Sequence, residues 1–594
     1  MAKFSAWKNM IPGLAFFVII GFILLSSVLR YRSGEIDYLN SDATWHTLLT
    51  IECYDETSAS EHLFLPIVSL GSEDDKYIPW GATIPDEKGN YYYTSFSPAG
   101  FFAAWLFIKI FRLPVAEGSI YIFNNVLLAI SAVLLMWLLF MVYQKNRYRD
   151  LLCFIGCVAY IWSPELLHGL GIVYWNQSLM QVTLLLQVNF YYRYTVKRSK
   201  GSRLLFYIMA LANPYIEWTG YVANVGFAIA ELILNWKTDR KKALGKAVII
   251  GFITAVSFGV FCIHYLLRVD AGMFFDTLKN RFMARNITSE TMLTDVIGGY
   301  FKSFLYLWIL LLIMLIWCFS LKGYLNLTNG MLFLVMAFPI LENVIMKQHA
   351  LAYTYDRMKA VLVLVFLICE VARNILETSA GKRATAVIAT LTVLFSVGNL
   401  HSYMINEAYI WNVDYRENNK KLAGYVTTLY PDAVYVSDTD IRGYMNLLFG
   451  RGIYEFTSVE TAKEIAKARG KEHIVYIEKD GYSLLAITIY SVDSDEWIQY
   501  SVENDEIVKK AEEKGIQAAD LSDENWDNGY SRESNTLLFC RSDDLLINLL
   551  SHDKIVTDVG VHIIESIDFD DLWIKVKLNG NASDCMYPAV LRVE

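Results

Sequence analysis

Long apolar runs constrain this sequence more than any other feature. They have roughly 17 to 25 residues each and recur from Ile11 to about Leu400, and this is the length that an α-helix needs to cross a bilayer. Because lipid offers the backbone no hydrogen-bond partners, each run is expected to be helical. The chain of 594 residues is 55% hydrophobic and 19% charged, too apolar for a soluble protein of this size. The sequence therefore predicts a polytopic α-helical membrane protein.

About eleven transmembrane helices are predicted. They are expected near residues 11–30, 120–143, 151–169, 178–195, 203–217, 219–236, 246–267, 300–320, 330–346, 358–376 and 384–400. The first run lacks a cleavage pattern and more spans follow it, so it is expected to be a retained helix. Basic segments fall on one side of this arrangement, namely MAKFSAWK, QKNRYR, RYTVKRSKGSR, KTDRKKALGK and NILETSAGKR. Positive loops face the cytoplasm, which predicts a cytoplasmic N-terminus in a plasma (inner) membrane protein.

The loops on the opposite, outer side are acidic or mixed, and the first of them, 31–119, is long. Within it, ATWHTLLTIECYDE has helical spacing. SPAGFFAAWLFIKIF, residues 97–111, is apolar but short, and is expected to be a helix at the outer interface. The chain therefore divides into a transmembrane domain, 1–400, and a polar tail, 401–594.

The tail is predicted to be an extracytoplasmic soluble α/β domain. Its segments DAVYVSD, HIVYIEK and SLLAITIYSV are typical of strands, and SVETAKEIAKARG is typical of an amphipathic helix. Cys540 and Cys585 could pair if this tail is extracytoplasmic. No basic stripe interleaved with aromatics is present, so nucleic acid is not an expected partner. No residue pattern demands a metal or another cofactor, although a divalent metal stays possible.

The first candidate site follows the first apolar run. Asp42 and His46 are four residues apart, so a helix places them on one face. A partly desolvated carboxylate at the water–lipid boundary can take a proton from a hydroxyl and act as a general base. Asp42 equally fits a helix N-cap. Asp55 and Glu56 extend the acidic cluster and also fit a solvated face.

Further ionisable groups lie near the outer ends of later spans. Glu165 and His168 occur in SPELLHG, and Glu217 occurs in PYIEWTG. Ionisable groups at membrane depth are functional candidates, but near helix ends water is close and the inference weakens.

A second stretch rich in charged and aromatic residues, ENVIMKQHALAYTYDRMK, joins two predicted spans on the outer side. It brings together the side chains of Lys347, His349, Tyr353, Asp356 and Arg357. Cations beside aromatics suit a phosphate group at the membrane surface. The alternative is interfacial anchoring, in which Lys, Arg and Tyr are common.

These features together resemble the GT-C superfamily of glycosyltransferases. The resemblance is carried by an acidic residue soon after the first span, by a long outer loop with interfacial helices, and by YYTSFSPAGFF, residues 92–102, which includes Ser97. The 347–357 connection and the EWTG segment are similar to those of bacterial members. In layout the chain is most similar to protein O-mannosyltransferases and lipid A aminoarabinose transferases.

The resemblance implies a cell-envelope enzyme that uses a sugar on a polyprenyl phosphate, presented from the outer leaflet. A lipid, glycan or protein hydroxyl would attack the anomeric carbon with inversion. Asp42 would be the base, His46 would orient it, and cations such as Lys347 or Arg357 would hold the departing phosphate.

Two other classes of function stay open at this point. A transporter or flippase for a lipid-linked sugar would need similar interfacial charges, but would place ionisable groups at mid-span and show internal repeats. A non-catalytic membrane sensor would leave the acidic outer loop unexplained. The enzyme interpretation predicts that Asp42, Glu165, Glu217 and His349 converge on the outer side.

Overall fold

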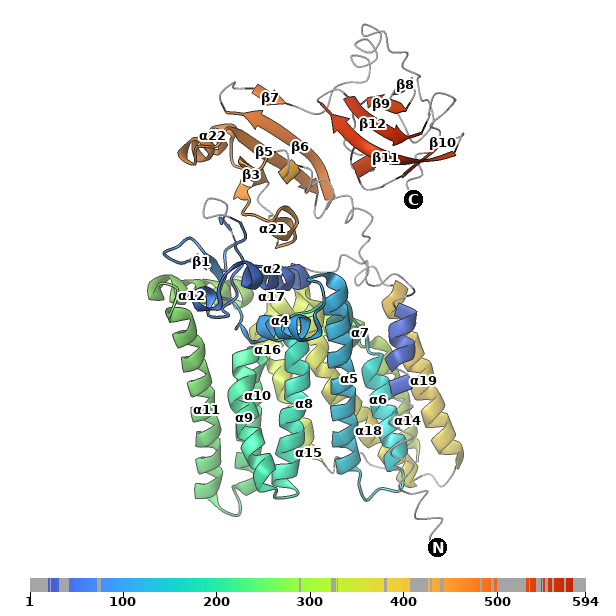
Figure 1. Cartoon of the computed structure of the whole chain (residues 1–594). Helices are drawn as coiled ribbons and strands as arrows, with labels where there is room; N and C mark the ends of the chain where they lie inside the picture. The colour runs from blue at the N-terminus through green and yellow to red at the C-terminus, as the bar shows by residue number, and fades with distance from the viewer. Residues whose placement is uncertain are drawn as a thin grey trace. The chain divides into compact units, whose positions relative to one another are not determined.

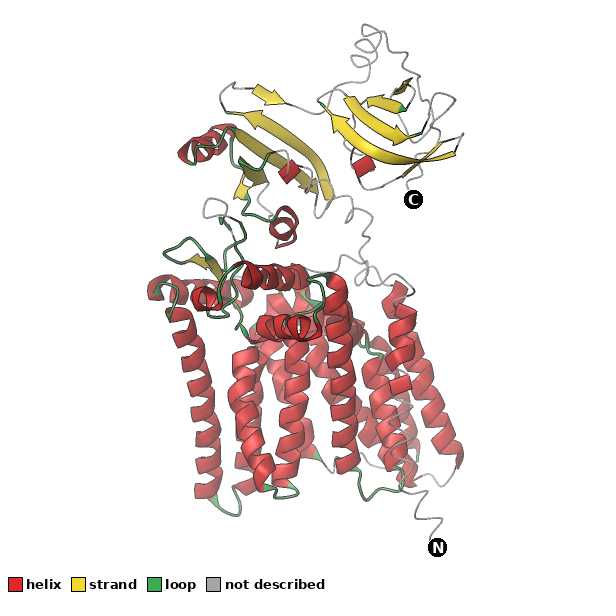
Figure 2. Ribbon diagram, in the orientation of Figure 1, coloured by secondary structure: helices red, strands yellow, loops and turns green. Residues whose placement is uncertain are grey.

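The computed structural model is mainly helical in its first four hundred residues, where β1 (Thr83–Pro85) and β2 (Tyr91–Tyr93) also form a two-stranded sheet, and it contains two larger sheets in the remainder (Figures 1 and 2). It describes residues 20, 21, 23–30, 32, 42–71, 76–78, 80–287, 290–321, 327, 329–378, 382–405, 423, 426, 427, 430–437, 443–480, 483–492, 496–498, 530–533, 535–540, 546, 549, 550, 554–557, 560–570 and 573–580. Residues 20, 21 and 23–30 of the predicted first span are helical, and the rest of that span lies outside this part of the chain.

The chain forms two compact units, which are considered separately. The first comprises Met1–Val68, Gly81–Glu87 and Tyr92–Asn412, and the second comprises Ser69–Trp80, Lys88–Tyr91 and Val413–Glu594. Two short segments of the predicted outer loop therefore group with the C-terminal residues.

The core of the first unit is a bundle of helices that run side by side (Figure 1). Its main members are α5 (Glu117–Val142), α6 (Arg149–Ile161), α8 (Asn176–Thr195), α9 (Lys200–Ile216), α10 (Thr219–Asn235), α11 (Arg240–Leu266), α14 (Leu305–Ser320), α18 (Ala360–Thr378) and α19 (Lys382–Ile405). Among the described residues, α5, α11 and α19 are each long and apolar enough to cross a membrane. Two bent helix pairs raise this number to five if each pair is one span. The predicted number of eleven spans is not confirmed.

Three of the predicted spans are interrupted in the structure. In the first, α6 ends at Ile161, and α7 (Pro164–Leu167) continues into a π-helical turn, His168–Ile172, at 62° to α6. In the second, α13 (Leu293–Ser303) meets α14 at 79°. The third is divided into α15 (Gly330–Ala337), a 3-10 turn containing Pro339, and α16 (Leu341–Ile345). Proline lacks a backbone N–H and clashes with the preceding turn, which accounts for the breaks at Pro164 and Pro339.

Short helices gather at one end of this bundle (Figure 1). They are α2 (Asp42–Glu56), α4 (Ala99–Phe111), α12 (Ala271–Asn286), α16 and α17 (Lys347–Ala352). The predicted helix at 97–111 is present as α4, and Lys109 on it pairs with Asp55 on α2 at 2.5 Å. The turns that follow α8 and α10 lie at the opposite end.

The second unit contains two five-stranded sheets. In the first, with strand order β4-β3-β5-β6-β7, β3 (Ala433–Ser437) is parallel to β4 (Tyr454–Glu455) and to β5 (His473–Asp480). Strand β6 (Ser483–Ser491) is antiparallel to β5, and β7 (Glu496–Ile498) is antiparallel to β6. Helix α22 (Val459–Ala468) begins after Ser458, whose side chain accepts from the Thr461 N–H. The predicted strands and helix of this region are confirmed.

The second sheet is antiparallel and was not predicted from the sequence. Its order is β10 (Lys554–Thr557), β11 (Gly560–Phe569), β12 (Trp573–Asn579), β9 (Thr536–Cys540) and β8 (Tyr530–Glu533). Cys585 and the side chain of Cys540 lie outside the described part of the chain, so their pairing stays a prediction.

Candidate active site

A six-residue 3-10 turn, η5 (Thr354–Lys359), organises the polar side chains at the end of the bundle where the short helices gather. In a 3-10 turn, residues three apart lie above one another, so Asp356 and Lys359 project from the same side. The Lys359 ammonium is 3.1 Å from Asp356 Oδ1 and donates to Thr219 Oγ1 at 3.0 Å. It also forms an ion pair with Glu342 on α16. All four side chains are buried.

Asp356 is the centre of this network. Its Oδ2 accepts from Asn343 Nδ2 at 3.0 Å and lies 3.2 Å from His349 Nδ1, and its Oδ1 accepts from Gln177 Nε2 at 3.3 Å. Burial alone would raise the pKa of Asp356, but Lys359 and His349 outweigh burial and lower it. Burial lowers the pKa of His349 even though Asp356 opposes the shift. At neutral pH the pair is therefore a carboxylate and a neutral imidazole that donates through Nδ1.

Glu217 joins the network through Gln177. It stands at the end of α9, and its Oε2 accepts from the Thr219 N–H that opens α10, at 2.7 Å. Its Oε1 lies 3.5 Å from the Gln177 Nε2 that also reaches Asp356. One amide on α8 therefore bridges carboxylates that are 139 positions apart in the chain, at residues 217 and 356.

Arg357 faces a different set of partners. Its Nε and Nη2 donate to Glu165 Oε1 at 3.2 and 3.1 Å, Nε also donates to Ser303 Oγ, and Nη1 donates to the Ala350 carbonyl oxygen at 2.7 Å. Next to it, the Thr354 hydroxyl is 2.6 Å from His168 Nδ1. The η5 turn thus holds the candidates from the 165–168 segment as well as Glu217 and His349.

The candidate residues on α2 make no direct contact with η5 among the contacts described above. Asp42 is the first residue of α2, and its side chain lies outside the described part of the chain. His46 is packed among aromatic rings, with centroid distances of 4.4 Å to Tyr93, 5.1 Å to Trp175 and 5.6 Å to Phe101. Burial lowers the pKa of His46 to about 3, so this imidazole is neutral at physiological pH.

Asp55 and Glu56 lie at the other end of α2 and do not join the η5 network. Both are exposed, and Asp55 accepts from Trp105 Nε1 at 3.2 Å besides pairing with Lys109. The contacts that the structure gives to Asp55 therefore link α2 to α4.

Aromatic rings connect His46 to the η5 network. Phe96 lies 5.3 Å from Trp175 and 6.0 Å from His349, centroid to centroid. Ser97, the next residue, is buried, and its carbonyl oxygen accepts from Asn176 Nδ2 at 3.1 Å. Lys347 is half-buried and Tyr353 is exposed, and the Tyr353 ring lies 4.6 Å from His349.

Sequence reasoning missed Arg285, which lies on α12 within a predicted outer loop. Its side chain is 7% exposed and its guanidinium lies 5.5 Å from the centroid of Phe96. No carboxylate within the described ranges pairs with it. A buried arginine of this kind can bind an anion through its planar fork. Its position within the RFMARN segment carried no signal, because cations are common in loops at a membrane surface.

Sequence reasoning also passed over Glu342 and Lys359, although both lie within the rich stretch. Lys359 immediately precedes a long apolar helix, and a lysine at such a boundary is a candidate by position. Asn343 and Gln177 gave no comparable signal.

The network is closely packed. The cavity lined by Gln177, Thr219, Asp356 and Lys359 has a volume of about 10 Å³, which is room for about one water. No group of three potential metal ligands occurs among the residues that the structure describes.

Comparisons with known proteins place this geometry in context. No protein-family model matches the chain, and no characterised protein matches its sequence. Among solved structures it is similar to the apo oligosaccharyltransferase of Archaeoglobus fulgidus, with a TM-score of 0.48 and 12% identity over 80% of this chain and 70% of that one.

Two ligand-bound structures are also similar. ArnT from Cupriavidus metallidurans bound to undecaprenyl phosphate has a TM-score of 0.43 and 12% identity, over 78% of this chain and 92% of that one. Archaeal oligosaccharyltransferase AglB from A. fulgidus, in complex with an inhibitory peptide and a dolichol-phosphate, has a TM-score of 0.43 and 11% identity, over 78% and 69% of the two chains.

Proposed function

We propose that this protein is a GT-C type glycosyltransferase of the cell envelope. It would move a sugar from a polyprenyl-phosphate donor to an acceptor hydroxyl on a lipid, glycan or protein, on the extracytoplasmic face and with inversion. The observation that carries this proposal is the convergence of three candidates on one turn, η5, at the end of the bundle that also bears α2: Glu165 and His349 contact it directly, and Glu217 reaches it through Gln177.

Such a reaction needs a base and a stabilised leaving group. As the acceptor oxygen bonds to the anomeric carbon, its proton passes to the Asp42 carboxylate. The bond from that carbon to the donor phosphate breaks, and its electron pair stays on the phosphate oxygen. His46, neutral and fixed by aromatic packing, would orient the acceptor side of the site without taking this proton.

Groups near η5 would stabilise the phosphate as its negative charge grows. Arg285 is buried beside Phe96 without a described carboxylate partner, and Lys347, His349 and Tyr353 are adjacent in the same connection. The guanidinium donors of Arg357 already contact Glu165, Ser303 and Ala350. Arg357 is therefore assigned the task of holding the connection in place, and Arg285 that of contacting the phosphate.

The polar contacts at the junction of α8, α9 and α10 do not favour a transporter. Where α8, α9 and α10 meet, the Gln187 amide donates to Asn224 Oδ1 at 2.8 Å and accepts from Asn213 Nδ2 at 2.6 Å. These groups are neutral amides. A proton- or ion-coupled transporter is expected to place ionisable groups at such positions.

Replacement of Asp42 by Asn tests the proposal. If Asp42 is the base, Asp42→Asn should lower turnover about a hundredfold or more and leave donor binding intact. If Asp42 only caps α2, Asn caps almost as well and activity should survive. The matched control is Asp55→Asn, on the same helix, which should retain wild-type turnover. Wild-type turnover in Asp42→Asn would contradict the assignment.

A further inference from the structure

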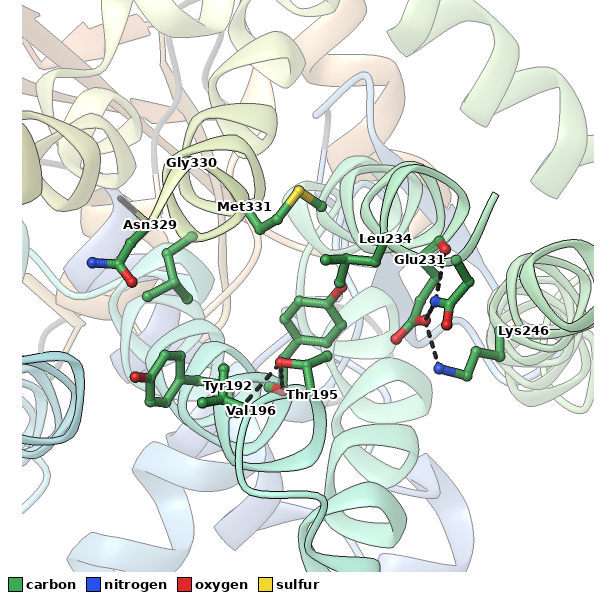
Figure 3. Close-up of a pocket in the computed structure, with 12 residues that line it drawn as sticks. Tyr192, Thr195, Val196, Glu231, Leu234, Lys246, Asn329, Gly330 and Met331 are labelled. Atoms are coloured by element: carbon green, nitrogen blue, oxygen red, sulfur yellow. Dashed lines mark hydrogen bonds and ion pairs between the residues drawn. The ribbon is translucent and has the colours of Figure 1, made fainter. Parts of the chain in front are cut away.

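A second polar site lies at the opposite end of the bundle from η5, between the ends of four helices. A cavity of about 350 Å³ is lined by the last turns of α8 and α10, by Lys246 on α11, and by the start of α15 (Figure 3). This volume falls within the range of small-molecule sites. None of its lining residues belongs to the candidate active site.

Two residues that line this cavity each have a buried polar atom with no hydrogen-bond partner in the part of the chain that the structure describes. Glu231 Oε2 accepts from Lys246 Nζ and from Asn235 Nδ2, both at 2.8 Å, while Glu231 Oε1 has no hydrogen-bond partner within the described ranges (Figure 3). The Tyr191 hydroxyl is likewise without one. Both side chains are 1% exposed. Buried polar groups are normally paired, so these two residues of the cavity lining hold an acceptor and a donor whose partners are missing within the described ranges.

The cavity lies at a polar–apolar boundary of the bundle. Trp236, directly after α10, is 43% exposed, and the Arg240 guanidinium lies 5.4 Å from its ring centroid. Tryptophan and arginine are typical of the membrane–water interface. The neighbouring surface of α11 is apolar, with Val248 67% and Phe252 69% exposed. The cavity is therefore at the level of lipid head groups.

The wall of the cavity reaches the outer surface of the bundle. Val196 and Leu234 line it and are 56% and 44% exposed. A ligand whose polar end contacts Glu231 and Lys246 could therefore extend an apolar part along the outside of the bundle.

We propose that this cavity binds the head group of a phospholipid that carries both a phosphate and a primary ammonium, as in phosphatidylethanolamine. The ammonium donates to Glu231 Oε1, and the phosphate oxygens accept from the Tyr191 hydroxyl and from Lys246. The cavity contains one carboxylate and one ammonium, so a zwitterionic head group matches its balanced charge. This site is independent of the proposed transferase activity.

Lipid titration of the purified full-length protein in detergent tests the proposal. Phosphatidylethanolamine should raise the melting temperature and should be retained in native mass spectra. Phosphatidylcholine has no N–H donor, and phosphatidylglycerol has no ammonium, so each should bind about tenfold more weakly. Equal binding of all three lipids would overturn the proposal. A shift caused by soluble phosphoethanolamine, but not by the lipid, would overturn the lipid as the source.

Two variants separate the binding site from a structural effect. Tyr191→Phe removes only a hydroxyl that has no described partner, so the lipid-free protein should melt no lower than wild type, while the shift caused by phosphatidylethanolamine falls. Tyr160→Phe is the matched control, because Tyr160 is buried outside the cavity lining and its hydroxyl accepts from Gln181 Nε2 at 3.1 Å, and its lipid-induced shift should equal that of wild type. If both variants keep the full shift, the ligand does not contact Tyr191 and the proposal fails.

Discussion

Replacing Lys359 tests whether the η5 network stabilises this end of the bundle. Its ammonium is the cation shared by Asp356 and Glu342, and all three side chains are at most 6% exposed. Lys359→Met keeps most of the volume of the side chain and removes its charge. Both carboxylates would then remain buried without their shared ion-pair partner.

The expected loss of folding stability follows from this burial. Removing one partner of a buried ion pair costs about 3 to 5 kcal/mol, whereas exposed pairs contribute about 1 kcal/mol or less. Since Lys359 also donates to Thr219 Oγ1, Lys359→Met should lose about 3 to 5 kcal/mol of stability. The double variant Lys359→Met with Glu342→Gln should regain about 1 kcal/mol or more, because it removes one of the stranded charges.

Thermal unfolding of the purified variants in detergent measures this loss. The matched control is Lys347→Met, in the same connection, where the side chain is half-buried and no described carboxylate pairs with it. That variant should change stability by about 0.5 kcal/mol or less. Equal melting temperatures for Lys359→Met and Lys347→Met would refute the argument that the η5 network stabilises this end of the bundle.

Three further predictions follow from the same contacts. Burial lowers the pKa of His46 to about 3, so between pH 6.5 and pH 3 this imidazole is protonated only in the unfolded chain. The free energy of unfolding should therefore fall by about 2 kcal/mol from pH 7 to pH 5. His46→Phe should remove this part of the pH dependence of the melting temperature. Arg357→Ala should lower the melting temperature, because it leaves Glu165 buried without its cation, and Arg357→Lys should restore part of the loss; unchanged melting of both would contradict the assigned role. A cysteine introduced by Ser458→Cys should react with an impermeant thiol reagent on intact cells, and labelling only after lysis would contradict the extracytoplasmic assignment of the tail.

The helices and strands that could be predicted from the sequence are those whose hydrophobic pattern lies within one continuous segment of the chain. The apolar run at 120–143 corresponds to α5, Glu117–Val142, and the strand patterns of the tail correspond to β3, β5 and β6. The interrupted spans were not predicted, because mean apolarity does not register where the backbone bends. Pro339 stands between Phe338 and Ile340, so only the missing N–H of proline marks the break at that position.

The candidate site shows the same limit. The stretch 342–359 was singled out by its density of charged and aromatic residues, and Asp356 and His349 do contact one another. The contact between Glu165 and Arg357 joins residues 192 positions apart, and no sequence spacing can reveal it. Arg285 was missed for the same reason, since its position beside Phe96 depends on how α12 packs in the bundle.

The proposed transfer of a sugar from a polyprenyl phosphate can be measured directly. The most direct measurement incubates the purified wild-type protein with a panel of polyprenyl-phosphate sugars and candidate acceptors, and determines the product and its anomeric configuration. We expect transfer from at least one donor, with inversion at the anomeric carbon and with turnover that falls about a hundredfold or more in Asp42→Asn. A glycoside product that retains the donor's configuration would contradict the proposed single displacement, and no transfer or donor binding with any member of the panel would contradict the function itself.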